Sequence, residues 1–235
     1  MKVNSINTVS NSKYNLQKSK KAVTVASIAG SALGIAGTVA GLYAVAKKGN
    51  PATSLLNLKY AEKDALIIGA GSILGGLAGG LIADKNKENV NPKLREASQQ
   101  FVGNTLFPIV SSALANKALD RTGFKLPQIN SNSKFAKVAN IVLSAAPKVI
   151  VTLGSLVGGM QIGNKVMNAV NNKIFKEEVK HSIAPEDMLV HSDDICLATN
   201  MLFKDTKVIS SITSKALPLT MIIPGAKAGM QQKEC

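Results

Sequence analysis

Residues 22–46 read AVTVASIAGSALGIAGTVAGLYAVA, and residues 65–83 read ALIIGAGSILGGLAGGLIA; neither stretch contains a charged side chain. A helix rises 1.5 Å per residue, so the first stretch would be roughly 37 Å long, enough to cross the roughly 30 Å hydrocarbon layer of a bilayer. Lysines precede and follow it, and a loop of 18 residues leads to the second stretch. The sequence therefore predicts two transmembrane helices.

Both stretches are rich in glycine rather than leucine. Residues four apart share one face of a helix, and helices in lipid associate where small residues allow close backbone contact. The second stretch has two such stripes, one of Gly71, Gly75, Gly79 and Ala83 and one of Ser72, Gly76 and Gly80. We expect a tight hairpin in which Gly30, Gly34 and Gly41 face the second stripe. The predicted helix-packing residues are Gly30, Gly34, Gly37, Gly41, Gly71, Gly75, Gly76, Gly79 and Gly80.

The segment from Gly69 to Ala83 resembles the glycine-zipper segments of small bacterial envelope proteins. This resemblance implies a packing motif and no function; the alternative is that glycine and alanine merely dilute a generic span. Residues 66–71 also resemble the strand and first turn of a dinucleotide-binding fold. Leu74 occupies the place of that motif's third glycine, however, and the residues after Ala83 are polar and not strand-like. No cofactor is predicted.

The formal charge of +14 is spread along the chain rather than gathered in one stripe. Basic residues lie between apolar segments, where anionic lipid headgroups attract them by about 1 kcal/mol each. Hydrophobic residues make up 46% of the chain, but aromatic residues only 4%, fewer than a soluble core of this length normally uses. We therefore expect a bilayer with anionic headgroups as partner, and no nucleic acid.

The predicted organisation has four parts. A basic polar tail (1–21) precedes the transmembrane hairpin (22–83, with spans 22–46 and 65–83). Residues 84–137 hold an amphipathic helix, a short apolar segment at 101–115 and a polar loop. Residues 138–235 hold an apolar helix at 138–164, an acidic amphipathic helix at about 185–203 and a final apolar segment at 208–226. The fold class is an all-α integral membrane helical bundle.

Two features of the third and fourth parts allow more than one interpretation. The segment 101–115 is short for a span and contains Pro108, so it is re-entrant, interfacial or a kinked span. In 138–164, Lys148 within the membrane would mark a pore or ion path. We expect instead that Pro147 breaks this helix and that Lys148 reaches an interface.

The N-terminal region predicts location and orientation. The apolar run after residue 21 is too long for the core of a signal peptide, so it is expected to remain as an anchor. Five lysines precede the first span and four basic residues follow the second, against four in the connecting loop. This bias favours a cytoplasmic N-terminus in a bacterial inner membrane. A polar start before two close spans also resembles membrane-inserted effectors and translocator subunits of specialised secretion systems.

One acidic cluster surrounds both histidines. His181, Asp187, His191 and Asp194 are candidate metal ligands, because imidazole and carboxylate suit zinc. The alternative, which we favour, is a solvated amphipathic helix whose acids neutralise nearby lysines. The sequence contains no phosphate loop, paired-cysteine metal motif or nucleophile elbow. A metal-dependent enzyme is thus a distant alternative, and no small-molecule substrate is identified.

The expected function is that of a non-enzymatic membrane protein. It would form homo-oligomers through its glycine-rich helix faces, as a scaffold or a small pore. The alternative is a secreted, membrane-inserted effector or translocator-like protein that acts through interaction.

Overall fold

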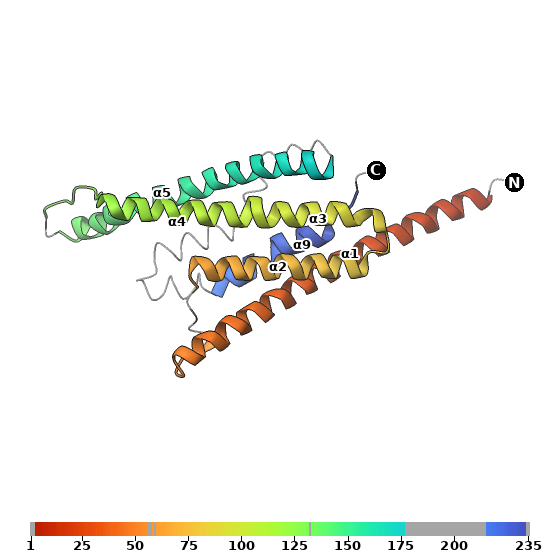
Figure 1. Cartoon of the computed structure of the whole chain (residues 1–235), viewed down its shortest axis with the longest axis horizontal. Helices are drawn as coiled ribbons and strands as arrows, with labels where there is room; N and C mark the ends of the chain where they lie inside the picture. The colour runs from red at the N-terminus through yellow and green to blue at the C-terminus, as the bar shows by residue number, and fades with distance from the viewer. Residues whose placement is uncertain (1–2, 56–57, 59, 132, 177–214, 234–235) are drawn as a thin grey trace. The chain divides into compact units, whose positions relative to one another are not determined.

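The computed structural model describes residues 3–55, 58, 60–131, 133–176 and 215–233. These residues are almost entirely helical, and none of them forms a strand (Figure 1). The elements are α1 (Val3–Gly49), α2 (Glu62–Ala83), η2 (Lys87–Asn89), α3 (Val90–Ser98), η3 (Gln99–Leu106), α4 (Phe107–Thr122), α5 (Lys134–Val170), η4 (Asn171–Phe175) and α9 (Ile222–Met230). The predicted all-helical class is therefore confirmed for the described part of the chain.

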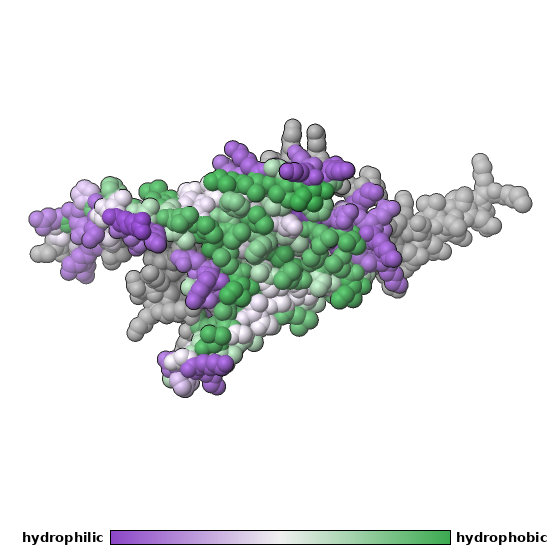
Figure 2. Space-filling view, in the orientation of Figure 1, coloured by the Kyte–Doolittle hydropathy of each residue, from purple (hydrophilic) through white to green (hydrophobic). Residues whose placement is uncertain are grey.

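Three of these helices are long and apolar enough to cross a membrane. They are Ser19–Gly49 within α1, Glu62–Ala83, and Lys134–Phe175, which joins α5 and η4. Large apolar side chains on them face outward: Leu33 is 73% exposed, Leu74 65% and Ile150 68%. Figure 2 shows apolar side chains over much of the visible face and hydrophilic ones gathered in patches. Such extensive apolar surface suits lipid rather than water.

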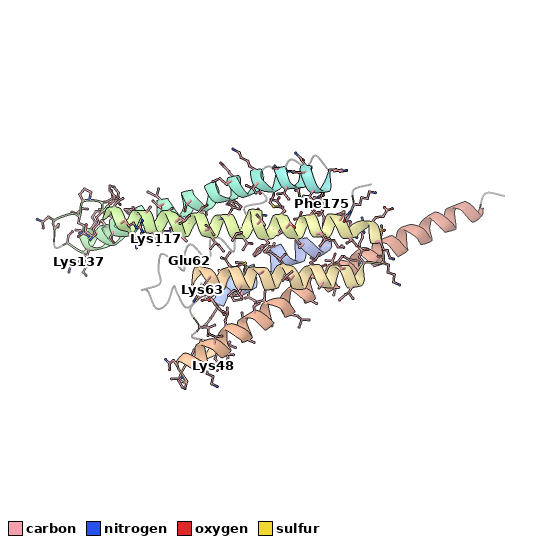
Figure 3. The ribbon with its side chains drawn as sticks, viewed as in Figure 1. Lys48, Glu62, Lys63, Lys117, Lys137 and Phe175 are labelled. Carbon is pink, nitrogen blue, oxygen red and sulfur yellow. The ribbon has the colours of Figure 1, made fainter. Side chains whose placement is uncertain are left out.

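Local signals in the sequence set several helix ends. Asp64 accepts a hydrogen bond from the backbone N–H of Ala61 (2.8 Å) at the start of α2, and Ser133 accepts one from Ala136 (3.0 Å) at the start of α5. The helix α4 ends at Gly123, whose φ of 63° is left-handed and favours glycine. Figure 3 labels Lys48 at the end of α1 and Glu62 and Lys63 at the start of α2, where charged groups flank the apolar helices.

The helical chain continues past both prolines that the sequence left in question. The expected break at Pro147 is wrong, because α5 runs through it from Lys134 to Val170. Pro108 is the second residue of α4, the helix that directly follows the π-helical segment η3. Local π adjustment is one way in which a membrane helix accommodates proline. The predicted short segment 101–115 is thus part of one helical stretch from Val90 to Thr122.

The described helices divide into two compact units. One comprises Met1–Val45, Ile67–Phe101 and Met221–Cys235; the other comprises Ala46–Leu66 and Val102–Thr220. In the first, Ile73, Ala97 and Ala228 form a small apolar core with Leu77 and Phe101 packed against it. In the second, α5 packs against α4 (Figure 1).

The contact between α4 and α5 combines close backbone approach with polar pairing. A Cβ atom built on Gly159 would lie 2.7 Å from the carbonyl oxygen of Phe107, and one on Gly163 would lie 2.6 Å from that of Gly103. Further along, the side chains of Asn116 and Thr152 exchange hydrogen bonds of 2.9 and 3.2 Å. Lys148 forms an ion pair of 3.0 Å with Asp120 of α4, and both side chains are about half exposed.

Leucine at Gly163 should separate α5 from its neighbour, whereas leucine at Gly158 should not. No atom lies within 4 Å of a Cβ atom built on Gly158, so this residue of the same helix is a matched control. We expect Gly163→Leu to lower the free energy of unfolding by about 3 kcal/mol through overpacking and Gly158→Leu to leave it nearly unchanged. Thermal unfolding in detergent micelles measures both, and equal effects of the two variants would contradict the packing described.

Candidate membrane-embedded packing site

The closest contact between α1 and α2 is made by glycines. A Cβ atom built on Gly30 would overlap the carbonyl oxygen of Gly75, and one on Gly34 would overlap that of Gly71. Gly79 approaches Ala26 in the same way. Residues further along α1 therefore contact residues that come earlier in α2, so the two helices are antiparallel. At these positions backbone touches backbone, and any larger residue would push the helices apart.

The neighbouring face of α2, which carries the second stripe, makes the same kind of contact with α9. Gly76 lies against the backbone of Gly225, and Gly80 lies against that of Gly229. Residues further along α2 contact residues further along α9, so these two helices are parallel. The four small residues of α9 favour this approach, and all four are buried together with Pro224; the buried residues are Pro224, Gly225, Ala226, Ala228 and Gly229.

The structure therefore places the predicted packing glycines in three groups. Gly30 and Gly34 lie against the first stripe of α2, not against the second. The second stripe lies against α9, with Ser72, Gly76 and Gly80 all at the contact. Gly37 and Gly41 have no atom within 4 Å of a Cβ atom built there.

Buried hydroxyl groups join all three helices near the middle of the two predicted spans. The hydroxyl oxygens of Ser31 and Ser72 lie 2.7 Å apart, and neither side chain is exposed. Ser72 donates to the carbonyl oxygen of Met221, and the single hydroxyl proton of Ser31 is shared between Ser72 and the carbonyl oxygen of Ile222 (3.1 Å). Interhelical hydrogen bonds of this kind contribute about 0.6 kcal/mol each in membrane proteins.

A fully buried lysine, Lys93, binds the C-terminal end of α9 to the residue that follows α2. The ammonium group of Lys93 lies 2.6 Å from the carbonyl oxygen of Gly229, 2.9 Å from that of Gln231 and 3.1 Å from Oδ2 of Asp84. These three acceptors match its three N–H groups, which a buried cation requires. Two of the acceptors are carbonyls at the C-terminal end of α9, where a positive charge is favoured.

Asp84 is held ionised by its surroundings, although its side chain is only 5% exposed. Burial raises its pKa, but hydrogen bonds from the Asn86 backbone and the Asn89 side chain, and the hydrogen bond and charge of Lys93, outweigh burial and lower the pKa below 3.8. Asn89 also accepts a hydrogen bond from the backbone N–H of Lys233 (3.0 Å). The last described residues of the chain are therefore tied to the turn between α2 and α3.

Sequence reasoning missed two parts of this site. Gly225 and Gly229 have the same four-residue spacing as the other packing glycines, so that signal was available, but the final apolar segment was expected to end at residue 226. The role of Lys93 had no signal in the sequence, because its partners are 9 residues before it and 136 and 138 residues after it.

The candidate metal ligands His181, Asp187, His191 and Asp194 lie outside the described residues, as does the acidic helix expected at about 185–203. Among the residues that the structure does describe, no group of three or more histidine, cysteine, aspartate or glutamate side chains is arranged to hold a metal ion.

Comparison of the chain with protein-family models, with curated proteins and with solved structures gives no match.

Leucine at Gly30 should disrupt the α1–α2 contact, whereas leucine at Gly37 of the same helix should be tolerated. The first substitution forces a side chain into the backbone of Gly75, and the second points into open space. We expect a loss of about 3 kcal/mol in the free energy of unfolding for Gly30→Leu only. The measurement is chemical or thermal unfolding of the monomer in an excess of micelles, where self-association does not contribute to stability. Comparable losses in both variants would refute this assignment of faces.

Asp84 should also make the free energy of unfolding depend on pH in the acidic range. Its folded pKa lies below the unfolded value of 3.8, so its contribution is fully present above that value and is lost as the pH falls through the folded pKa. We expect Asp84→Asn to cost about 3 kcal/mol at pH 7, because it leaves a buried cation without its counterion, and to weaken the acid dependence below about pH 4.

The control for this variant is Glu88→Gln. Glu88 and Lys233 form a mostly exposed pair at 3.6 Å, which should contribute less than about 1 kcal/mol. Unfolding curves from pH 3 to pH 8 compare the two variants, and an Asp84→Asn protein as stable as the Glu88→Gln protein at pH 7 would count against the buried network.

Proposed function

We propose that the protein is a non-enzymatic integral membrane protein that self-associates, as a scaffold or a small pore, in a bacterial inner membrane. The observation that carries the proposal is the set of three helices long and apolar enough to cross a membrane, with large apolar side chains on their outer faces. A water-soluble protein of this size would bury such side chains in its core.

The proposed transmembrane unit is a glycine-zipper hairpin of α1 and α2. Its support is the backbone contact at Gly30, Gly34, Gly71 and Gly75, which lets the helices approach more closely than leucine-rich helices do. In lipid, dispersion between closely packed backbones takes the place of the hydrophobic driving force. The second stripe on α2 extends the same packing to α9 within one chain.

Self-association then uses the face of α1 that the described part of its own chain leaves uncovered. This face has two neighbouring stripes, one of Ala32, Ala36, Ala40 and Ala44 and one of Leu33, Gly37, Gly41 and Val45, and all eight residues are exposed. Their four-residue spacing is that of the inner face, which already packs closely on a helix. The glycines that contact α2 and α9 are occupied within the chain.

Charged residues at the helix ends favour anionic headgroups as the lipid partner. Lys20 and Lys21 precede the apolar part of α1, and Lys85 and Lys87 follow α2; all four are exposed. The positive-inside rule favours these residues, and with them the N-terminus, on the cytoplasmic side.

The double variant Gly37→Leu/Gly41→Leu tests self-association. It should shift the protein from oligomer to monomer, because leucine removes the small-residue surface while nothing inside the chain is displaced. Chemical cross-linking in vesicles of phosphatidylethanolamine and phosphatidylglycerol measures the oligomer, and co-flotation with the vesicles measures insertion.

The control is Gly154→Leu/Gly158→Leu, since these two glycines of α5 also have open space around them. It should keep both the oligomer and the insertion. Cross-linking that is equal in the two double variants would exclude the outer face of α1 as the surface of self-association.

A further inference from the structure

We infer that α9 is a fourth membrane-embedded element, which leaves the bilayer on the side where α2 ends, so that both ends of the chain lie on one side. The inference rests on the proposed membrane insertion of α1 and α2. It adds an element that the three span-length helices do not include and fixes the side of the C-terminus.

The directions of the helices in the first unit give the first argument. Because α1 is antiparallel and α9 parallel to α2, the start of the apolar part of α1, the end of α2 and the end of α9 lie at the same end of this unit. Lys93 reinforces this, since one ammonium group contacts both Asp84, directly after α2, and Gln231, directly after α9. Asn89 holds the backbone of Lys233 at the same end.

The depth of the contacts gives the second argument. Ser31 and Ser72 lie well inside the uncharged stretches 22–46 and 65–83, and they donate to the carbonyls at the beginning of α9. From there α9 follows α2 past Gly76 and Gly80. If α2 crosses the bilayer, α9 therefore occupies the same depth from about the middle of α2 to its end.

A count of crossings gives the third argument. The helices α1 and α2 return the chain to the side on which it began. The contacts of Gln231 and Lys233 require an even number of crossings after Ala83. The helix α9 runs parallel to α2, toward this required side, so that an α9 embedded in the bilayer emerges where the count demands.

Labelling of single cysteines in the full-length protein tests this topology. The Cys196→Ser variant keeps Cys235 as its only thiol, two residues beyond Lys233. In a protein that lacks both native cysteines, Ser54→Cys reports the loop before α2, and Lys85→Cys reports the end of α2. Each protein is treated with a membrane-impermeant maleimide in intact and in permeabilised spheroplasts.

We expect Cys235 to label like Lys85→Cys and opposite to Ser54→Cys. Labelling of Cys235 together with Ser54→Cys would overturn the inference while leaving the two-span hairpin intact. Identical labelling of Ser54→Cys and Lys85→Cys would instead contradict the insertion of α2, and so the proposed function itself.

A cysteine at Ile223 tests whether α9 is covered by lipid. Ile223 is 37% exposed in the structure, so within the protein alone its side chain is accessible. In the bilayer, Ile223→Cys should resist the impermeant maleimide even in permeabilised spheroplasts and react once detergent dissolves the membrane. Ready reaction before detergent is added would show that α9 docks outside the lipid, contrary to the inference.

Discussion

The approach of one helix backbone to another is the constraint on which the first unit depends. At the contacts of Gly30 with Gly75 and of Gly76 with Gly225, no space remains for even one methyl group. The helix α2 is the centre of this arrangement, because each of its two glycine stripes faces a different partner. A protein with few aromatic residues can pack in this way, since the contact uses backbone atoms rather than large side chains.

The buried polar groups of the first unit form hydrogen bonds that depend on the close packing of its helices. The hydroxyls of Ser31 and Ser72 reach the carbonyls of α9 only because the glycines beside them bring the helices close. Lys93 binds the two carbonyls at the other end of α9 and Asp84. Each contact of α9 thus combines apolar packing with a satisfied polar group, which a lipid environment demands because it offers no water.

The sequence predicts the helical class and the two apolar spans well, because length, lack of charge and flanking lysines are local signals. It also indicates which residues are small enough to pack. The sequence pointed to the second stripe of α2 as the face toward Gly30 and Gly34, whereas these residues lie against the first, because both stripes have the same spacing. It gave no indication of the contact of Lys93 with carbonyls more than 130 residues away. Pro147 was misjudged because packing of α5 on α4 compensates for the hydrogen bond that a proline removes from a helix.

The central claim is that this chain is built into a bilayer, and alkaline carbonate extraction of membranes from cells that express the full chain tests it most directly. Immunoblotting then divides the protein between the membrane pellet and the supernatant. The account predicts that the protein stays in the pellet, because carbonate removes peripheral proteins but not helices that cross the lipid. Release into the supernatant would contradict the account, and the glycine contacts would then belong to a water-soluble helical protein.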